Sequence, residues 1–194
     1  MKKGLLIVIS GPSGVGKGTV RHHFEQNEDL NLAYSVSMTT RAPRNNEEDG
    51  VQYFFRSREQ FEQSIEKGEL LEWAEFVGNY YGTPKQYVED LRSQGKNVLL
   101  EIEVQGAIQV KEACPDAITV FIIPPSLEEL ESRIRGRATE AEETVQRRLE
   151  KARKEMKLVH HYKYIVCNDD PILAADLITS IIKRNMEINK ETAE

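Results

Sequence analysis

The stretch VISGPSGVGKGTV, residues 8–20, constrains the fold of this chain more than any other. It continues the apolar run LLIVI at 5–9, which is typical of a strand buried on both faces. The glycines that follow let backbone N–H groups close around phosphate oxygens, and Lys17 adds a full positive charge. A helix over 17–26 is expected to start at the loop. An ordinary strand-to-helix turn needs neither these glycines nor the lysine, so we predict a loop that binds nucleotide phosphates.

The loop departs from the usual phosphate-loop pattern at one position. That pattern has Ser or Thr directly after the lysine, where the hydroxyl binds Mg²⁺. Here Gly18 takes that place and the hydroxyl comes one residue later, at Thr19. We therefore expect Mg²⁺ to be held mainly by phosphates and waters, and Thr19 to serve the α-phosphate. The expected nucleotide-binding residues of the loop are Gly11, Pro12, Ser13, Gly14, Val15, Gly16, Lys17, Gly18 and Thr19.

Short apolar segments alternate with helical patterns along the rest of the chain. Further strands are expected at 97–103, 117–124 and 162–168, and helices at about 85–94, 104–113, 126–136, 140–160 and 170–187. Capping boxes fit Ser126 with Glu129 and Thr139 with Glu142, and Pro171 suits the first turn of the last helix. The alternation predicts an α/β fold, a parallel sheet with helices on both faces.

The region 35–83 breaks this alternation. It contains a polar turn, RNNEEDG, the short strand-like pieces VQYFF and NYYG, and one short helix at 57–67. We interpret it as an insertion that carries its own small mixed sheet.

Composition excludes several classes of protein. A chain of 194 residues with 39% hydrophobic and 30% charged residues reads as soluble and globular, with one or two domains. Its net charge of −6 and the lack of a basic aromatic face disfavour nucleic-acid binding. The run GLLIVIS is too short to span a membrane, and Cys114 and Cys167 read as reduced core thiols of a cytoplasmic protein. The oligomeric state, a homo-oligomer included, stays open.

The segment SVSMTTRAPRNNEEDGVQYFF at 35–55 resembles the signature of guanylate kinases. The resemblance rests on Thr40, Arg41, Arg44, Glu47, Gly50, Tyr53 and Phe55 at this spacing. It continues through LLEWAEFVGNYYGTP, LLEIEVQGA, IPPSLEELESRIRGRATE and VCNDD, in order over almost the whole chain. The chain is thus similar to bacterial-type guanylate kinases, which transfer the γ-phosphoryl group of ATP to GMP with Mg²⁺. The resemblance implies ATP and GMP as partners, and dGMP to an extent that the sequence leaves open.

The resemblance also implies an architecture. It is a P-loop NTPase three-layer core with a parallel sheet, a small mixed α+β insertion that binds GMP, and a helical lid that carries arginines. On this basis residues 1–194 form a single domain, with its core at 1–34, 84–125 and 158–194, its GMP-binding part at 35–83 and its lid at 126–157.

Within the GMP-binding part, the resemblance implies a phosphate site and a base site. Arg41 and Arg44 lie three residues apart near Tyr53 and Tyr81 in the sequence pattern, and arginine can bind phosphate through two parallel hydrogen bonds. A solvated surface pair is the ordinary alternative for two arginines in a polar loop. The family's contacts to guanine correspond to Glu72, Ser37 and Thr83. A carboxylate accepts from guanine N1–H and N2–H₂ together, whereas the N1 acceptor of adenine would repel it.

Glu101 and Glu103 end an apolar run and are expected to point to one side of a strand, toward the phosphates. The family usually has aspartates here, so this chain departs from the pattern by one methylene. The longer carboxylates are expected to contact GMP or the outer shell of Mg²⁺ through water, with no direct metal ligand from the protein. A charged strand end without a site role is the alternative.

Arginines of the expected lid complete the site. By resemblance, Arg133, Arg137 and Arg148 close over ATP and act with Lys17 and Arg41 in catalysis, because phosphoryl transfer depends mostly on positioning and charge stabilisation. Surface salt bridges to the many glutamates are the alternative for arginines on these helices. Asn168 matches a family position near adenine, although the NDD sequence could instead cap the last helix.

Two other functions remain to be weighed. A kinase for a different monophosphate is one, because adenylate kinases share the GKGT ending, although Glu72 favours GMP. A catalytically inactive guanylate-kinase-like module that binds proteins is the other. Such modules typically lose the intact loop, whereas Gly16 and Lys17 are both present here.

Overall fold

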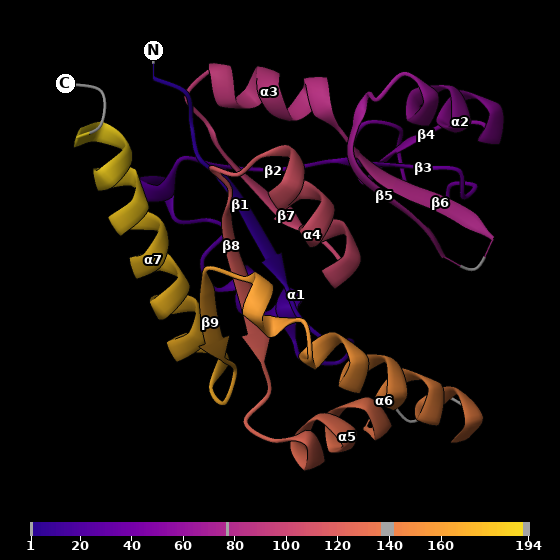
Figure 1. Cartoon of the computed structure of the whole chain (residues 1–194), viewed down its shortest axis with the longest axis vertical. Coiled ribbons are helices and arrows are strands. Elements are labelled where there is room, and N and C mark those ends of the chain that lie inside the picture. The colour runs from indigo at the N-terminus through magenta and orange to yellow at the C-terminus, as the bar shows by residue number, and fades with distance from the viewer. Residues whose placement is uncertain (1, 77, 137–141, 192–194) are drawn as a thin grey trace.

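The computed structural model describes residues 2–76, 78–136 and 142–191. These residues form a five-stranded parallel sheet flanked by helices, and a second, four-stranded sheet beside it (Figure 1). The parallel sheet has the spatial order β2 (Leu32–Tyr34), β7 (Asn97–Glu101), β1 (Leu6–Ser10), β8 (Ile118–Ile123) and β9 (Tyr164–Cys167), and all neighbouring strands are parallel. The predicted α/β fold with a parallel sheet is confirmed.

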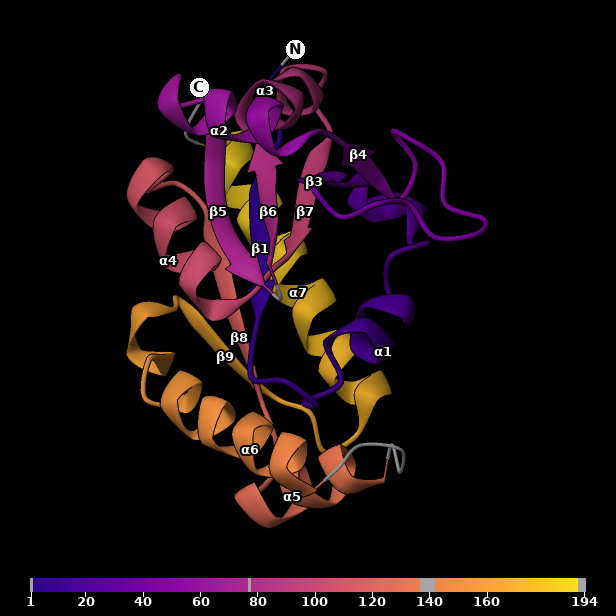
Figure 2. The same ribbon diagram turned by 90° about the vertical axis from the view of Figure 1, so that its right-hand side faces the viewer.

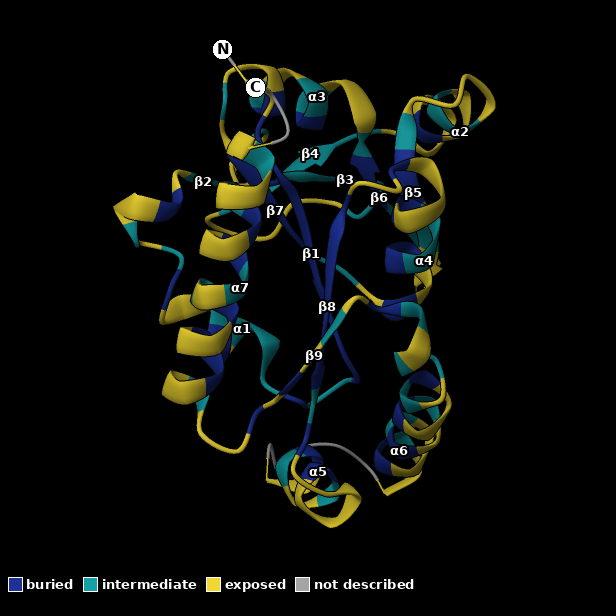
Figure 3. Ribbon diagram, turned by 60° about the vertical axis from the view of Figure 1, so that its left-hand side comes forward, coloured by how far each residue is buried: buried dark blue, intermediate teal, exposed yellow. Residues whose placement is uncertain are grey.

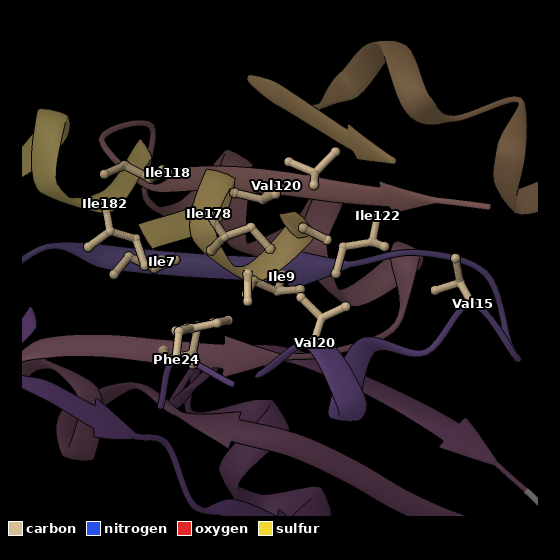
Figure 4. Packing of buried hydrophobic residues seen from close by; sticks show 14 of the residues in the cluster. Ile7, Ile9, Val15, Val20, Phe24, Ile118, Val120, Ile122, Ile178 and Ile182 are labelled. Atoms are coloured by element: carbon tan, nitrogen blue, oxygen red, sulfur yellow. The ribbon is translucent and has the colours of Figure 1, made fainter. Parts of the chain in front are cut away.

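Strand β1 lies at the centre of this sheet, and all five of its residues are buried (Figure 3). Alternate side chains point to opposite faces of the sheet. On one face they pack with α1 (Lys17–His22) and α7 (Pro171–Glu191), in a cluster that includes Ile7, Ile9, Val20, Ile178 and Ile182 (Figure 4). On the other face they pack with α3 (Lys85–Ser93) and α4 (Val104–Ala113), in a cluster that includes Leu6, Val8, Val88, Val104 and Val110. The apolar run therefore forms a strand covered on both sides, as its composition predicts.

The region 35–83 does contain a small mixed sheet. Its strands lie in the order β4 (Tyr53–Phe55), β3 (Ser37–Thr39), β6 (Asn79–Pro84) and β5 (Leu70–Phe76). Only β3 and β4 are parallel. Helix α2 (Arg58–Glu66) begins at a capping box made by Ser57 and Gln60. Figure 2 shows β5 and β6 in front of the parallel sheet.

Two further helices, α5 (Leu127–Arg135) and α6 (Glu142–Met156), lie together at one end of the molecule (Figure 1). Ser126 caps α5, because its hydroxyl accepts a hydrogen bond from the backbone of Glu129 at 3.1 Å. Pro171 opens α7 as expected. The proposed pair of Thr139 and Glu142 involves a residue outside the described ranges.

Two helices end earlier than their sequence patterns predict. Helix α1 ends at His22 rather than at 26, and α6 ends at Met156 rather than at 160. Beyond both ends, most backbone hydrogen bonds run to the carbonyl three residues back, as in Phe24 to Arg21 at 3.0 Å. This tighter bonding stops the α-helix. After α6 it continues into a short 3₁₀ segment, Val159–His161, and a second such segment, Glu28–Leu30, precedes β2.

Two other predictions need correction. Strand β2 was not expected, and it adds a short edge to the parallel sheet. Cys114 is buried, but Cys167 is exposed on edge strand β9 and is not a core residue. Among the described residues, no helix has the length and apolar character that crossing a bilayer requires.

Candidate active site

The loop between β1 and α1 turns tightly at the carboxyl edge of the parallel sheet. Gly14 and Gly16 adopt φ angles of 85° and 93°, which residues with side chains rarely adopt. A Cβ atom would lie 2.6 Å from Ile134 Cγ1 at Gly14, and 2.7 Å from Asn168 Nδ2 at Gly16. The turn and its packing against α5 and the end of β9 therefore both require glycine at these positions.

Lys17 begins α1, and its side chain folds back over the loop. Its Nζ atom donates hydrogen bonds to the carbonyl oxygens of Gly11 at 2.7 Å and Pro12 at 3.3 Å. Burial lowers the pKa of Lys17, while the carboxylates of Glu101 and Glu155 oppose that shift. The loop thus holds an ammonium group at its centre, with its charge supported by nearby acids.

A cavity of about 660 Å³ joins this loop to the mixed sheet. On the loop side its lining includes Gly11, Ser13, Gly14, Gly16, Lys17, Gly18 and Thr19. On the mixed-sheet side it includes Ser37, Tyr53, Glu72 and Tyr81, and Glu101 at the end of β7 lines it as well. The structure thus brings most residues of the two expected sites into one cavity. Of the remaining loop residues, Pro12 and Val15 are buried.

Glu72 of β5 is a buried carboxylate that faces the cavity. It is 7% exposed, and its Oε1 atom accepts a hydrogen bond from the Thr83 hydroxyl of neighbouring strand β6 at 2.6 Å. Burial raises the pKa of Glu72 to about 7, although the Thr83 hydrogen bond opposes the rise. A buried acid with unused acceptor capacity is suited to a ligand that presents adjacent N–H donors.

Arg41 is held by a carboxylate of its own loop. Its guanidinium makes two hydrogen bonds to Glu47, at 3.0 and 2.9 Å, and lies 5.4 Å from the ring centre of Tyr53. Glu47 also accepts from the backbone N–H of Arg44 at 2.7 Å, and the Arg44 side chain is exposed. The Arg41 guanidinium keeps the pKa of Glu47 below its usual value. Glu47, part of the sequence signature but not among the expected site residues, therefore organises this arginine loop.

Two of the three expected lid arginines contact the glycine loop or its support. Arg133 of α5 donates from Nη1 to the carbonyl oxygen of Asn168 at 3.0 Å and from Nε to Glu129 at 2.8 Å. Arg148 of α6 donates to the Ser13 hydroxyl at 3.1 Å. Arg137 lies outside the described residues.

The carboxylates expected near Mg²⁺ lie where β7 ends. Glu101 is the last residue of the strand and Glu103 is the N-cap of α4, so they do not alternate along one strand as predicted, yet both line the cavity. Glu101 forms an ion pair with Arg21 at 2.9 Å, and Glu103 forms one with Lys151 at 2.8 Å. The described residues contain no cluster of three or more metal-ligating side chains. The carboxylate oxygens of Glu101 and Glu103 are of the kind that Mg²⁺ accepts, directly or through water.

Asn168 supports the loop from behind. Its Nδ2 atom donates to the carbonyl oxygen of Val15 at 2.7 Å, and the residue is 4% exposed. The NDD sequence does cap α7, as the alternative predicts, but through Asp170, whose Oδ1 accepts from the backbone N–H groups of Ile172 at 2.7 Å and Leu173 at 3.2 Å. Asn168 Oδ1 is buried, and it has no hydrogen-bond partner within the described ranges.

Sequence reasoning missed a second buried acid of the cavity, Glu155 of α6. Glu155 is 8% exposed, and burial raises its pKa while Lys151 and Lys17 oppose the rise. A signal was present, because Glu155 continues the helical spacing of the buried residues Leu149 and Ala152. An acid at an apolar position of an amphipathic helix is a reason to suspect a site residue.

Comparison with known proteins gives a consistent result. A family model described as Guanylate kinase matches residues 3–185. The guanylate kinase of Halalkalibacterium halodurans is 58% identical over 181 residues, which cover 93% of this chain and 88% of the relative. That of Streptococcus thermophilus is 54% identical over 182 residues, covering 94% and 87%. A crystal structure of guanylate kinase from Anaplasma phagocytophilum has a TM-score of 0.71 at 34% identity, covering 95% of this chain and 87% of that one.

Proposed function

Because this chain belongs to the guanylate kinase family, we propose that its cavity holds both substrates, GMP against the mixed sheet and the ATP phosphates on the glycine loop. The reaction is transfer of the γ-phosphoryl group from ATP to GMP, which gives ADP and GDP. The observation that carries the proposal is that Lys17 and Glu72 line the same cavity.

Guanine is read by Glu72 in this proposal. Its carboxylate accepts from N1–H and N2–H₂ of the base, while the Thr83 hydroxyl fixes the carboxylate and Ser37 adds a polar contact. The buried surroundings support the assignment, because a mismatched polar group is costly there. Adenine presents an acceptor at N1 and no amino group at C2, so it meets the carboxylate unfavourably.

The GMP phosphate is bound by Arg41, Arg44, Tyr53 and Tyr81, with Glu101 near it. Support comes from the Arg41 guanidinium, whose orientation is fixed by Glu47 and by the face of Tyr53. Arginine presents paired N–H donors that match two phosphate oxygens. A phosphate oxygen of GMP is itself the nucleophile and is ionised at neutral pH, so the reaction needs no general base.

The ATP phosphates lie on residues 11–19, with Lys17 across the β- and γ-phosphates. Arg133, Arg137 and Arg148 neutralise charge as the phosphoryl group moves, and Asn168 contributes to the adenine side. The contacts of Arg133 and Arg148 with the loop region support these roles. Mg²⁺ bound with ATP would supply further charge neutralisation, with Glu101 and Glu103 in its outer shell. The protein's part is to align the two phosphates and to exclude water.

The chain divides into functional parts in the same proposal. Residues 35–83 bind GMP, residues 126–157 form the lid, and the core consists of 1–34, 84–125 and 158–194. Support comes from the separate mixed sheet and from the pairing of α5 with α6. Free Cys114 and Cys167 suit a reducing compartment, so the proposed location is the cytoplasm.

A panel of monophosphates tests the base assignment directly. With ATP as donor, we expect GMP to be phosphorylated and AMP, UMP and CMP to react at least about 10⁴-fold less efficiently, because none satisfies a buried carboxylate. dGMP is expected to react, since it keeps the guanine base. The measurement is ADP formation at equal enzyme concentration. Preference for AMP would contradict the assignment, and phosphopeptide binding without turnover would favour the protein-binding alternative.

GMP binding is expected to depend on the ionisation of Glu72. Its pKa is raised from 4.5 to about 7, so the charged form that accepts from guanine is lost as pH falls through 7. We expect GMP affinity to weaken by about tenfold between pH 8 and pH 6 from this group alone. The pH profile of kcat/KM for GMP over this range measures it, with the profile of Glu72→Gln as the reference for ionisation of the GMP phosphate, because slow turnover of the variant is still measurable. Identical pH dependence in the two proteins would contradict the prediction.

A further inference from the structure

Helix α4 is fastened to the strand that carries Glu72. The Gln109 side chain bonds both backbone groups of Trp73: its Oε1 accepts from the Trp73 N–H at 3.1 Å and its Nε2 donates to the Trp73 carbonyl at 3.0 Å. Strand β5 is an edge strand of the mixed sheet, so these groups of Trp73 face away from β6. The Gln109 amide thus makes the two backbone hydrogen bonds that a neighbouring strand would make to Trp73, the residue that follows Glu72.

One turn earlier on α4, Gly106 makes room for the Glu72 carboxylate. A Cβ atom at Gly106 would lie 2.5 Å from Glu72 Oε2 and 3.1 Å from Glu72 Cδ. Residues three apart on a helix share a face, so Gly106 and Gln109 both point to β5. No left-handed φ requires glycine at this position, so the contact with Glu72 is what excludes a side chain.

We infer that Gly106 and Gln109 are positioning residues for guanine selection, which act by setting where the Glu72 carboxylate lies. Gly106 provides the space into which the carboxylate extends. Gln109 fixes the position of β5 relative to α4 through its two hydrogen bonds to Trp73. The Thr83 hydrogen bond at 2.6 Å holds the same carboxylate from the opposite strand. Glu72 is therefore confined between a helix of the parallel-sheet layer and a strand of the mixed sheet. The inference rests on the proposed role of Glu72 in reading guanine.

Each substitution has a defined consequence. In Gly106→Ala, the added methyl group forces the carboxylate away from α4 and strains its bond to Thr83. Alanine is a better helix former than glycine, so instability of α4 is not a competing explanation for a loss. In Gln109→Ala, two backbone groups of Trp73 lose their partners and β5 is free to shift. Gln105→Ala is the matched control, because Gln105 is exposed on the same helix.

Discrimination between GMP and IMP is the readout, because IMP lacks the 2-amino group. We expect Gly106→Ala to lower the ratio of kcat/KM for GMP to that for IMP at least tenfold, through KM for GMP, with ADP affinity within twofold of wild type. Gln109→Ala should move the ratio in the same direction by a smaller factor, and Gln105→Ala should leave it unchanged. The pH midpoint of GMP binding should fall in Gly106→Ala, since the displaced carboxylate gains solvent.

Two comparisons decide between failure of this inference and failure of the proposed base site. If Glu72→Gln collapses the ratio while Gly106→Ala and Gln109→Ala keep it, the positioning role is wrong and the base site stands. If Glu72→Gln keeps the ratio, both are wrong. Equal losses of GMP and ADP affinity in the α4 variants would indicate general damage and would also overturn the inference. Should Gly106→Ala not fold, Gln109→Ala against Gln105→Ala still decides it.

Discussion

Lys17→Ala is expected to lower kcat by about a thousandfold, the usual loss when a preorganised charge contact to the transition state is removed. The ammonium lies over the loop, 2.7 Å from the Gly11 carbonyl, where an incoming phosphate chain would meet it. Steady-state turnover of GMP with saturating ATP measures the loss.

The fold is expected to survive this change. Lys17→Ala removes an ammonium group that burial already disfavours, as its lowered pKa shows, so the folded state loses little by the change. The glycines that shape the loop stay in place. The melting temperature should therefore stay close to that of wild type. Lys183→Ala serves as the control, since Lys183 pairs with Asp29 at the surface of α7, 2.8 Å away, and should keep normal turnover. A purified, folded Lys17→Ala protein with near-normal turnover would refute the role given to Lys17.

Glu72→Gln is expected to lower kcat/KM for GMP by about 10⁴-fold, because a buried site built to accept two N–H donors would then present an amide donor to one of them. The side-chain volume hardly changes, so the loss reports hydrogen-bond character rather than packing. Activity toward AMP should fall far less or rise. Kinetics with both monophosphates measure the change. Glu75→Gln, an exposed position of the same strand, is the matched control and should behave as wild type.

The same variant separates function from stability. The folded protein raises the pKa of Glu72 from 4.5 to about 7, so it favours the protonated acid. The stabilisation that comes from the neutral acid is complete below about pH 4.5 and is lost as pH rises through 7. Glu72→Gln should thus melt at a higher temperature than wild type at pH 8 and at a similar temperature at pH 5. A lower melting temperature at pH 8 would show that the carboxylate is satisfied in another way.

The parallel core could be predicted because its signals are local. Residues 5–9, 97–103, 117–124 and 162–168 each form an apolar, β-branched run long enough to indicate a strand, and all four correspond to strands of one sheet. Strand β2 was not predicted, because its three residues, Leu32–Tyr34, are partly or fully exposed and lack a buried apolar pattern. The strand pairs with β7 on one side only. Short edge strands depend on a partner that the local sequence does not reveal.

The environment of Glu72 could not be predicted from the residues around it. In β5 its neighbours along the strand are Leu71 and Trp73, and a glutamate between them is equally suited to solvent. Glu72 is buried between Thr83 on the next strand and helix α4, where Gly106 has no side chain to occupy the space of the carboxylate. Gly106 is more than thirty positions away in the sequence. Resemblance to a family identified the residue, while the raised pKa and its cause became visible only in three dimensions.

The arginine loop shows a similar limit. Arg41 and Arg44 were expected beside aromatic rings, and Arg41 does lie near Tyr53. What orients it is Glu47, six positions along, through two hydrogen bonds that a polar turn sequence does not specify. Arg133 and Arg148 likewise find loop atoms more than a hundred positions away. Side-chain partners of this kind follow from the tertiary fold.

Two cations of the proposed phosphate sites already have hydrogen-bond acceptors within the protein, and a phosphate ligand has to meet them in that state. Arg41 has the carboxylate of Glu47 at 2.9 Å, and Lys17 has the carbonyl of Gly11 at 2.7 Å. An incoming phosphate must displace these acceptors or share their donors, which limits how tightly any phosphorylated ligand can be held. When a product departs, the same acceptors take the cations back, so no unpaired charge is left behind. We therefore expect inorganic phosphate, which has no base to add binding free energy, to compete only weakly with GMP.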